Sequence, residues 1–303
     1  MAHGSVMARR SKVAWWRGWP GAVALLTSTI AILPADGPRW AWMWAFALAI
    51  YAACKWLTWR RTPVAGAPPW RHAAYLLAWP GMDAQTFLTS EVGSATRVPV
   101  AAREWLSALL KTALGVAIFL GVARVLPRAH LLVISWTGML GLVMALHFGV
   151  FHLLSCAWRR LGVAAPPLMN RPLTATSAAE FWGRRWNLAF RDLTHRFLFR
   201  PLAPHIGGRG AVLVSFLVSG LIHEAVITVP AGGGYGGPTV FFGVQGLMVL
   251  IQRSSVGRRF GLEEGLGGWL STMLVLLVSA FVLFPPVFLD NIVVPFLAAV
   301  GAI

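Results

Sequence analysis

Long apolar runs separated by short connections constrain this chain more than any other feature of its sequence. A helix crosses the hydrocarbon core of a bilayer with about 20 apolar residues, at about 1.5 Å per residue. Because lipid offers no partner to free backbone groups, we expect helices throughout. The sequence predicts an all-α membrane protein, a polytopic bundle of about 7–8 spanning helices plus interfacial helices. The runs fall at 19–34, 39–59, 105–126, 130–152, 211–229, 239–252 and 269–289, with a partial candidate at 291–303.

Composition agrees with a membrane protein and narrows the classes of partner. The chain has 303 residues, of which 57% are hydrophobic and 12% charged, and its mean hydropathy is +0.67. A net charge of +16 would suggest nucleic acid in a soluble protein. Here the arginines cluster between apolar runs, so we expect membrane lipids and no nucleic acid as partners. The two cysteines, Cys54 and Cys156, are too few for a disulfide framework.

The arginine clusters alternate with loops that carry little charge. The basic loops lie within 60–104, 159–210 and 253–259, and the others are 34–39, 124–130 and 231–238. Cytoplasmic loops carry the excess of Lys and Arg. We therefore predict a cytoplasmic N-terminus and an uncleaved first span, and we expect a bacterial inner membrane.

A single integral membrane domain is expected over 1–303. It divides into N-terminal spans at 1–60, a motif-bearing core at 75–250 and C-terminal spans at 269–303. The basic region 60–104 contains PVAGAPPW and LAWPGMDAQTF. Their prolines and glycines break helices, so we expect short interfacial pieces there and no span.

Ionisable side chains inside a predicted span mark candidate sites, because charge is costly in lipid. Lys55 and Lys111 lie near span ends, so they are expected to reach the membrane surface. His223 and Glu224 lie past the midpoint of 211–229. Ser215, Ser219 and His223 follow a spacing of four, which predicts one polar helix face beside a lined cavity.

A neutral histidine at this depth is a candidate general base, since burial favours the uncharged imidazole. The alternative is structural, because a buried histidine often only bonds a neighbouring helix. Glu224 points about 100° away from His223, so we expect it to pack the site or pair with an arginine.

No metal site is predicted. His147 and His152 are five residues apart, about 140° around an α-helix, so they are not expected to share a face. The sequence contains no HExxH zinc motif and no GxSxG nucleophile elbow.

The segment EFWGRRWNLAFRDLTHRFLFR at 180–200 predicts an amphipathic helix in the inner interface. Headgroup binding by arginine and an aromatic belt of tryptophan explain most of it. Neither explains Asn187, an uncharged amide among cations. On the helical wheel one face holds Trp182, Trp186, Ala189, Phe190, Leu193 and Phe197, and the other holds Arg184, Asn187, Arg191 and His195.

The FWGRRWN block at 181–187 and the later SGLIHE block at 219–224 resemble two blocks of the membrane-bound O-acyltransferase family, in its wax-synthase-like branch. WPGMDAQTF at 79–87 and LHFGVFH at 146–152 are also similar to blocks of that branch. The resemblance covers roughly 75–250. It implies a bundle of tilted helices around a transmembrane reaction tunnel. This chain is short for the family, so peripheral helices are expected to be missing.

The resemblance also implies an activity and assigns residues to it. Family members move an acyl group from acyl-CoA to a hydroxyl acceptor, which the branch suggests is a long-chain alcohol in wax ester synthesis. His223 matches the catalytic histidine and Asn187 the second signature residue, which holds the thioester carbonyl or orients the imidazole. Acyl-CoA is a co-substrate, and no cofactor is expected. The candidate substrate-binding residues are Arg184, Arg185 and Arg191, which would meet the anionic coenzyme A, together with Trp186 and Ser219.

Two other functions remain open from the sequence. A transporter of a small polar solute or lipid would use the stripe of Ser215, Ser219 and His223 as a path. Such proteins usually carry two similar halves, which the sequence lacks. A catalytically inactive scaffold of the same fold is the second alternative.

Overall fold

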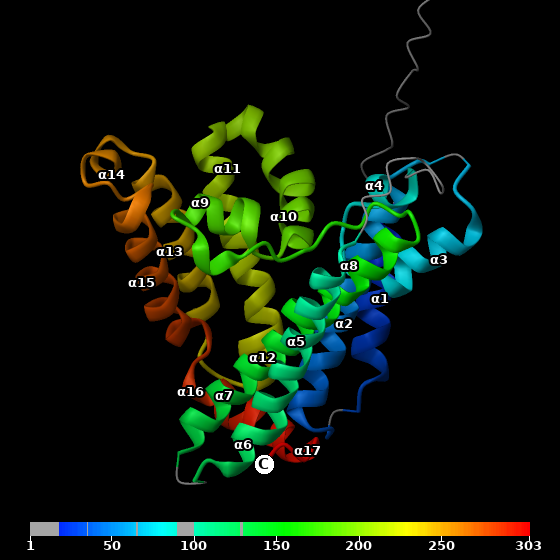
Figure 1. The fold of residues 1–303 in the computed structure, drawn as a ribbon, viewed down its shortest axis with the longest axis vertical. Helices are drawn as coiled ribbons and strands as arrows, with labels where there is room; N and C mark the ends of the chain where they lie inside the picture. The colour runs from blue at the N-terminus through cyan, green and yellow to red at the C-terminus, as the bar shows by residue number, and fades with distance from the viewer. Residues whose placement is uncertain (1–17, 35, 65, 90–99, 128–129) are drawn as a thin grey trace, which may run out of the picture.

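The computed structural model describes residues 18–34, 36–64, 66–89, 100–127 and 130–303. In this part of the chain all regular structure is helical and no strand forms, which confirms the all-α prediction (Figure 1). The N-terminal helices are α1 Trp19–Ile32, α2 Arg39–Arg60, α3 Pro69–Ala78, α4 Ala84–Thr89, α5 Ala102–Val116, η1 Ala117–Val122, α6 Ala123–Val125, α7 Leu131–Val143, η2 Met144–Val150 and α8 Phe151–Arg160.

The second half of the chain begins with short pieces and continues with longer helices. The connection after α8 crosses the molecule before α9 begins (Figure 1). The elements are η3 Pro172–Thr174, α9 Ala178–Glu180, η4 Phe181–Arg185, α10 Leu188–Thr194, η5 His195–Phe199, α11 Arg200–His223, η6 Glu224–Thr228, α12 Val229–Ala231, α13 Gly237–Gln252, α14 Ser255–Arg259, α15 Gly265–Leu283, α16 Pro286–Phe288, η7 Leu289–Val293 and α17 Val294–Ala299.

Four continuous helical segments among the described residues are long and apolar enough to cross a membrane. They are Ala102–Gly121, Leu131–Arg160, Leu188–Ala231 and Gly265–Leu283. Shorter apolar helices cover Trp19–Ile32, Gly237–Gln252 and Pro286–Ala299. Every predicted run is therefore helical, but the predicted total of about 7–8 spans is not confirmed by length and composition.

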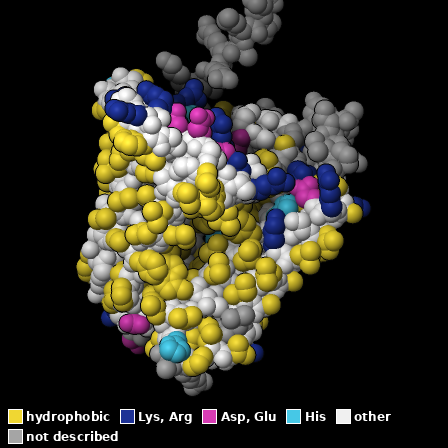
Figure 2. All heavy atoms as spheres, turned by 60° about the vertical axis from the view of Figure 1, so that its left-hand side comes forward, with side chains coloured by type: hydrophobic (Ala, Val, Ile, Leu, Met, Phe, Trp, Pro, Cys, Tyr) yellow, Lys and Arg dark blue, Asp and Glu magenta, His cyan; other side chains and the backbone are white. Residues whose placement is uncertain are grey.

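The outer surface of the spanning helices is apolar, as lipid contact requires. Leu106, Leu109, Leu110 and Leu114 of α5 are each more than half exposed, and their spacing places them on one helix face. Figure 2 shows hydrophobic side chains over most of one face, with lysine and arginine gathered in its upper half. This distribution supports an integral membrane protein.

The basic connections lie at one end of the molecule. Figure 1 places α3, α4, α14 and the first part of α11 at the upper end, and α6, α12, α16 and α17 at the lower end. Helix α11 turns back at this upper end, where Gly207 has a φ of 72°, a conformation that suits glycine. The chain therefore has a basic end and an end poor in charge, as the alternation of loops predicted.

The sequence prediction for Lys55 is wrong. Lys55 does not reach the surface: it is 1% exposed, its Nζ donates to the Gly81 carbonyl at 2.7 Å, and it lies 3.2 Å from the centre of the Tyr75 ring. The C-terminal run, a predicted partial span, forms the short apolar helix Pro286–Ala299, in which Ile292 and Leu297 are buried in an apolar core.

The 180–200 segment is not one amphipathic helix either. It forms η4, then breaks at Trp186 and Asn187, and resumes as α10. Trp186 is extended and Asn187 is left-handed, with a φ of 42°. The break turns Asn187 out of the predicted helix face, and it creates the site described next.

Candidate functional site

His223 is the last residue of α11, where the backbone changes from α-helical to π-helical bonding. Its ring is half-buried between aromatic side chains from two other helices. The Phe242 ring of α13 lies 4.5 Å away and the Phe190 ring of α10 lies 6.3 Å away, measured between ring centres. The imidazole therefore lies where α10, α11 and α13 meet.

One hydrogen bond fixes the tautomer of His223. Its Nδ1 lies 2.7 Å from the Ser219 carbonyl oxygen. A carbonyl oxygen only accepts, so Nδ1 carries the proton and donates it. In the neutral ring Nε2 is then left with its lone pair, as a general base requires.

The hydroxyl groups of the predicted polar stripe are bonded within their own helix. Ser215 Oγ donates to the Ala211 carbonyl at 2.7 Å, and Ser219 Oγ donates to the Ser215 carbonyl at 2.8 Å. Ser219 is 5% exposed. Its position next to His223 is as predicted, but the feature that touches the imidazole is its backbone carbonyl.

Asn187 caps the N-terminus of α10 from the left-handed conformation. Its Oδ1 accepts the Phe190 N–H at 3.3 Å, and its own N–H donates to the Met169 sulfur at 3.2 Å. Asparagine is the residue besides glycine that adopts this conformation most readily, and it is among the best N-caps. Within the described residues Asn187 Nδ2 has no recorded hydrogen bond, so two N–H donors remain free.

Phe190 lies between Asn187 and His223. Its backbone N–H binds Asn187 Oδ1, and its ring stands edge-on to the imidazole of His223 at an interplanar angle of 83°. No direct hydrogen bond between Asn187 and His223 is found among the described residues. The structure therefore brings both residues to the same helix junction, and the imidazole is oriented by Ser219.

Backbone hydrogen bonds hold the Asn187 break in place. Leu188 N donates to the Leu168 carbonyl at 3.0 Å, and Asn170 N donates to the Arg185 carbonyl at 2.8 Å. The 168–170 segment thus runs beside 185–188 and supplies the partners that a broken helix lacks.

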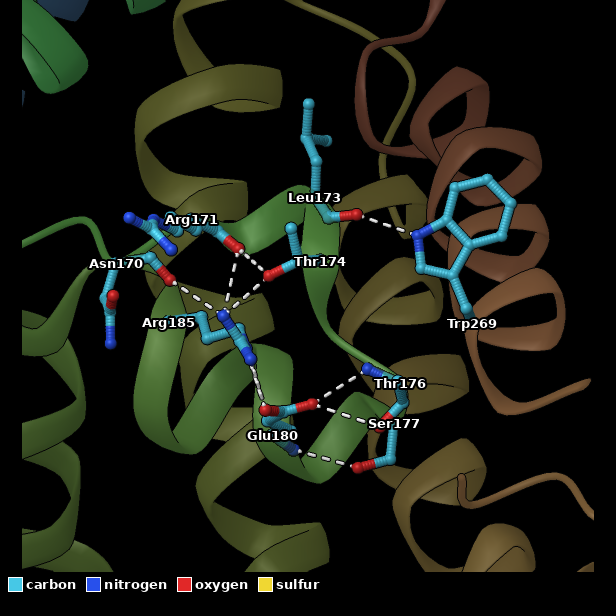
Figure 3. Close-up of polar contacts among 9 residues, drawn as sticks. All are labelled: Asn170, Arg171, Leu173, Thr174, Thr176, Ser177, Glu180, Arg185 and Trp269. Carbon is cyan, nitrogen blue, oxygen red and sulfur yellow. Dashed lines mark hydrogen bonds and ion pairs between the residues drawn. The ribbon is translucent and has the colours of Figure 1, made fainter. Parts of the chain in front are cut away.

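Arg185 and Glu180 close the loop before the break (Figure 3). The Arg185 guanidinium pairs with Glu180, with Nη2 to Oε1 at 2.6 Å, and it donates to Thr174 Oγ1 at 2.7 Å. It also donates to the Asn170 and Arg171 carbonyls. From α15, the indole of Trp269 donates to the Leu173 carbonyl at 2.7 Å. The Arg185 guanidinium therefore binds groups of its own loop and is not positioned to bind a ligand.

Glu180 belongs to a capping box. Ser177 Oγ accepts the Glu180 N–H at 3.1 Å, while Glu180 Oε2 accepts the Thr176 N–H at 2.8 Å. Burial acts to raise the pKa of Glu180, but the hydrogen bonds from Thr176 and Arg185 outweigh it and hold that pKa below its ordinary value.

The remaining predicted binding residues differ in their surroundings. Arg184 is exposed. Arg191 is exposed and pairs with Asp192 at 3.0 Å. The Trp186 ring is stacked on Phe181 at 5.6 Å and on His147 at 6.4 Å. Arg184 and Arg191 are thus the two predicted arginines with accessible guanidinium groups, and Trp186 forms a wall.

Glu224 anchors α13 and does not pair with an arginine in the described part of the chain. Its Oε1 accepts the backbone N–H and the hydroxyl of Thr239, each at 3.0 Å. Thr239 lies in the first turn of α13, where a carboxylate is favoured by the helix dipole. Glu224 thereby ties α11 to the helix that carries Phe242 against His223.

The histidines of LHFGVFH correct one sequence argument. The segment η2 is a π-helix, in which residue i bonds residue i+5. His147 and His152 therefore line one pocket, although α-helical geometry would separate them. Glu104, His152 and Cys156 also cluster, but the Arg159 guanidinium donates to both Glu104 and Cys156. It repels a further cation from that cluster.

The segment that contains Asn187 and His223 is similar to known proteins. Residues 165–244, which include Asn187 and His223, match the sequence profile of the "Membrane bound O-acyl transferase family". The chain is 31% identical over 137 residues to "Long-chain-alcohol O-fatty-acyltransferase" of Simmondsia chinensis, covering 41% of this chain and 39% of the relative.

Two proteins of Arabidopsis thaliana show the same similarity. "Probable long-chain-alcohol O-fatty-acyltransferase 9" is 33% identical over 144 residues, covering 43% of this chain and 42% of the relative. "Acyl-CoA–sterol O-acyltransferase 1" is 36% identical over 67 residues, covering 20% and 19%. The chain thus spans about two fifths of the length of the longer matches. Over residues 165–244, which contain FWGRRWN and SGLIHE, the chain is therefore similar to the membrane-bound O-acyl transferase family, and its longer matches are to long-chain-alcohol O-fatty-acyltransferases.

Proposed function

We propose that this protein transfers an acyl group from acyl-CoA to a hydroxyl acceptor within the membrane, with a long-chain alcohol as the acceptor. The observation that carries the proposal is the His223 imidazole, whose Nδ1–H is held by the Ser219 carbonyl while Nε2 keeps its lone pair. The names of the relatives support the class of acceptor. The sterol acyltransferase among them makes a sterol the alternative acceptor to test.

The proposed reaction needs one base and one hydrogen-bond donor. His223 Nε2 takes the proton of the alcohol as its oxygen bonds to the thioester carbonyl carbon. The carbon–sulfur bond then breaks, and coenzyme A leaves as a thiolate that takes the proton back from the imidazolium. Asn187 Nδ2 would donate to the carbonyl oxygen as negative charge develops on it. We choose this role over orienting the imidazole for two reasons. The Asn187 Nδ2 donors are free, and the Ser219 carbonyl already orients the His223 ring.

Arg184 and Arg191 are the proposed contacts for the phosphates of coenzyme A, because their guanidinium groups are exposed near the Asn187 break. Arg185 is left out of this role, since its guanidinium is bound to Glu180 and the loop. No cofactor is needed for the reaction, because a thioester is already activated.

The transporter alternative has less support. The hydroxyls of Ser215 and Ser219 are both donated to carbonyls of the preceding turn. They are therefore part of the helix backbone network and do not form a free row of donors for a solute.

The proposal is tested by acyl transfer in membranes that contain the protein. Labelled acyl-CoA is offered with hexadecanol or a sterol, and the ester is quantified. His223→Ala should lower the rate by about 100-fold to 10,000-fold, the usual contribution of a general base. His195→Ala is the matched control, because His195 is exposed and, among the described residues, its ring stacks on Phe199. Ester formation undiminished in His223→Ala would refute the mechanism.

A further inference from the structure

A second polar pocket lies apart from His223, between α5, η2, α8 and the segment after α8. Its basic lining is Lys111, His147 and His152, and its apolar lining is Phe148 with the Pro167–Met169 segment. Lys111 lies nine residues into α5, about 13 Å along the helix from its basic end. Lys111 therefore lies at the middle of the spanning segment Ala102–Gly121 and not, as the sequence predicted, at the membrane surface, so its polar group needs partners there.

His147 contributes a buried nitrogen without a partner. Its Nδ1 is shielded from solvent and makes no hydrogen bond to any described residue, while its ring is stacked against Trp186. Buried polar atoms are nearly always bonded, so an unbonded one needs a ligand or a water. A neutral imidazole with its proton on Nδ1 would donate that N–H into the pocket.

Lys111 contributes a positive charge that no carboxylate balances among the described residues. Its recorded polar contact is with His152 Nδ1 at 3.5 Å. Glu104, a carboxylate in contact with His152 Nε2 at 3.2 Å, is already bonded by Arg159. The charges of Lys111, Arg159 and Glu104 add up to one net positive charge. An isolated charge is costly in a low-dielectric interior, so the pocket favours one negative charge.

The size of the pocket limits what can carry that charge. The cavity volume is about 10 Å³, room for one water-sized group, and the pocket is partly open. A carboxylate is planar and smaller than a phosphate, so it needs less side-chain movement to place an oxygen there. Phe148 and Leu168 give the head group apolar neighbours, and lipid-facing leucines flank Lys111 on α5.

We propose that the pocket formed by Lys111, His147 and His152 binds the carboxylate of a long-chain fatty acid. The Lys111 ammonium and the His147 Nδ1–H donate to its oxygens, and the alkyl chain lies along the apolar wall. Met169 lines this pocket and also accepts the Asn187 N–H through its sulfur. A ligand bound in the pocket would therefore contact Met169, the residue that accepts the backbone N–H of Asn187.

Equilibrium binding to the purified full-length protein in lipid nanodiscs tests this site without any acyl transfer. The probes are radiolabelled hexadecanoate, hexadecanol and hexadecyl phosphate, at a pH where the carboxylate is ionised. Hexadecanoate should bind the wild-type protein most tightly. Lys111→Met should weaken it by about tenfold or more, since a charge-assisted hydrogen bond is lost. His147→Phe keeps the stack on Trp186 and should also weaken binding.

Two variants separate the site from general damage. Leu110→Met, at the neighbouring lipid-facing position, should bind like the wild-type protein. Lys111→Arg keeps the charge and should retain most of the affinity, which also guards against misfolding of Lys111→Met. Tighter binding of hexadecanol or hexadecyl phosphate than of hexadecanoate would overturn the proposal, as would hexadecanoate binding that is unchanged in Lys111→Met.

This inference does not depend on the proposed function. Loss of ester formation in His223→Ala with hexadecanoate binding intact would support both. Normal binding in a protein without transferase activity would refute the proposed function and leave the carboxylate site standing.

Discussion

Asn187 has two chemically distinct ends, and only one of them is used by the fold. Its Oδ1 caps α10 through the Phe190 N–H, whereas its Nδ2 donors have no partner among the described residues. Asn187→Asp keeps the cap oxygen and removes both donors. We expect acyl transfer to fall by about 100-fold to 1,000-fold, the usual effect of losing an oxyanion donor. Thermal unfolding should change little, because aspartate is an equally good cap.

The matched variant is Asn187→Ala, which should lose stability as well as activity. Alanine in the left-handed conformation costs about 1–2 kcal/mol, and loss of the cap costs about 1 kcal/mol more. Both variants are compared by thermal unfolding in detergent and by the initial rate of ester formation. Full activity in Asn187→Asp would mean that the residue acts only as a cap.

The position of single residues was predictable where sequence spacing controls it and not where a tertiary contact does. Ser219 and His223 follow helical spacing, and the structure places them one turn apart on α11. Lys55 carries no signal of burial in its own segment. It is buried because the Gly81 carbonyl and the Tyr75 ring, from a later part of the chain, form its environment.

The loop that precedes Asn187 depends on one ion pair with a defined response to pH. The pKa of Glu180 is lowered in the folded protein because Thr176 and Arg185 bond its charged form. Its contribution to stability is therefore complete above its ordinary pKa of about 4.3 and is lost as the pH falls through the folded-state pKa. Glu180→Gln should unfold a few degrees below the wild-type protein at neutral pH, consistent with about 1 kcal/mol for a partly exposed pair.

The difference between these two proteins should shrink as the pH is lowered. Melting temperatures measured across the acidic range check the sign. Arg184→Gln is the control, because Arg184 is exposed and outside the Glu180 network. A gap between wild type and Glu180→Gln that is constant or widens in acid would contradict the assignment.

Two glutamines on one face of α13 join it to its neighbours. Gln245 Nε2 donates to Ser279 Oγ at 2.9 Å. Gln252 Nε2 donates to Thr272 Oγ1 at 3.0 Å, while its Oε1 accepts the Ala178 N–H at 2.8 Å. Gln252→Leu should destabilise the protein by about 1–3 kcal/mol, because it leaves a buried backbone N–H unpaired.

A double-mutant cycle isolates one of these bonds. Gln252→Ala and Thr272→Ala should show a coupling of about 0.6 kcal/mol, typical of hydrogen bonds between membrane helices. Unfolding free energies of the two single variants and the double variant provide the measurement. Strict additivity would show that Gln252 acts on α15 through packing alone.

The helices themselves were largely predictable, because each apolar run of spanning length became helical. Local changes of helix type were not. The break at Trp186 and Asn187 contains neither proline nor glycine, so the residue types there do not predict a helix break. The π-helical turn of η2 keeps the same residues and changes only their angular spacing. It therefore brings His147 and His152 to one pocket in a way that an α-helical wheel excludes.

For the molecule as a whole, charge and apolar surface define two ends and a belt between them. Exposed apolar side chains cover the flanks of α5 and α15, and the basic loops lie at the end opposite α12 and α16 (Figure 1). Sequence alternation predicted this separation, because it depends only on which loops carry arginine. The burial of the His223 ring and of the 286–299 segment depends on packing between segments that are distant in the sequence. The alternation of basic and uncharged loops carries no information about that packing.

Membrane orientation is the prediction that belongs to this scale. If the basic end faces the cytoplasm, a cysteine in α14 and one in the glycine-rich loop before α13 should be accessible from opposite sides. Val256 and Tyr235 are 57% and 67% exposed, so Val256→Cys and Tyr235→Cys should react with a membrane-impermeant maleimide. Val256→Cys should react in inverted vesicles and Tyr235→Cys in intact cells. The protein with only its native cysteines is the background, since Cys156 is buried and Cys54 partly buried. Labelling of both positions from one side would show that the separation of charge does not correspond to the two faces of the membrane.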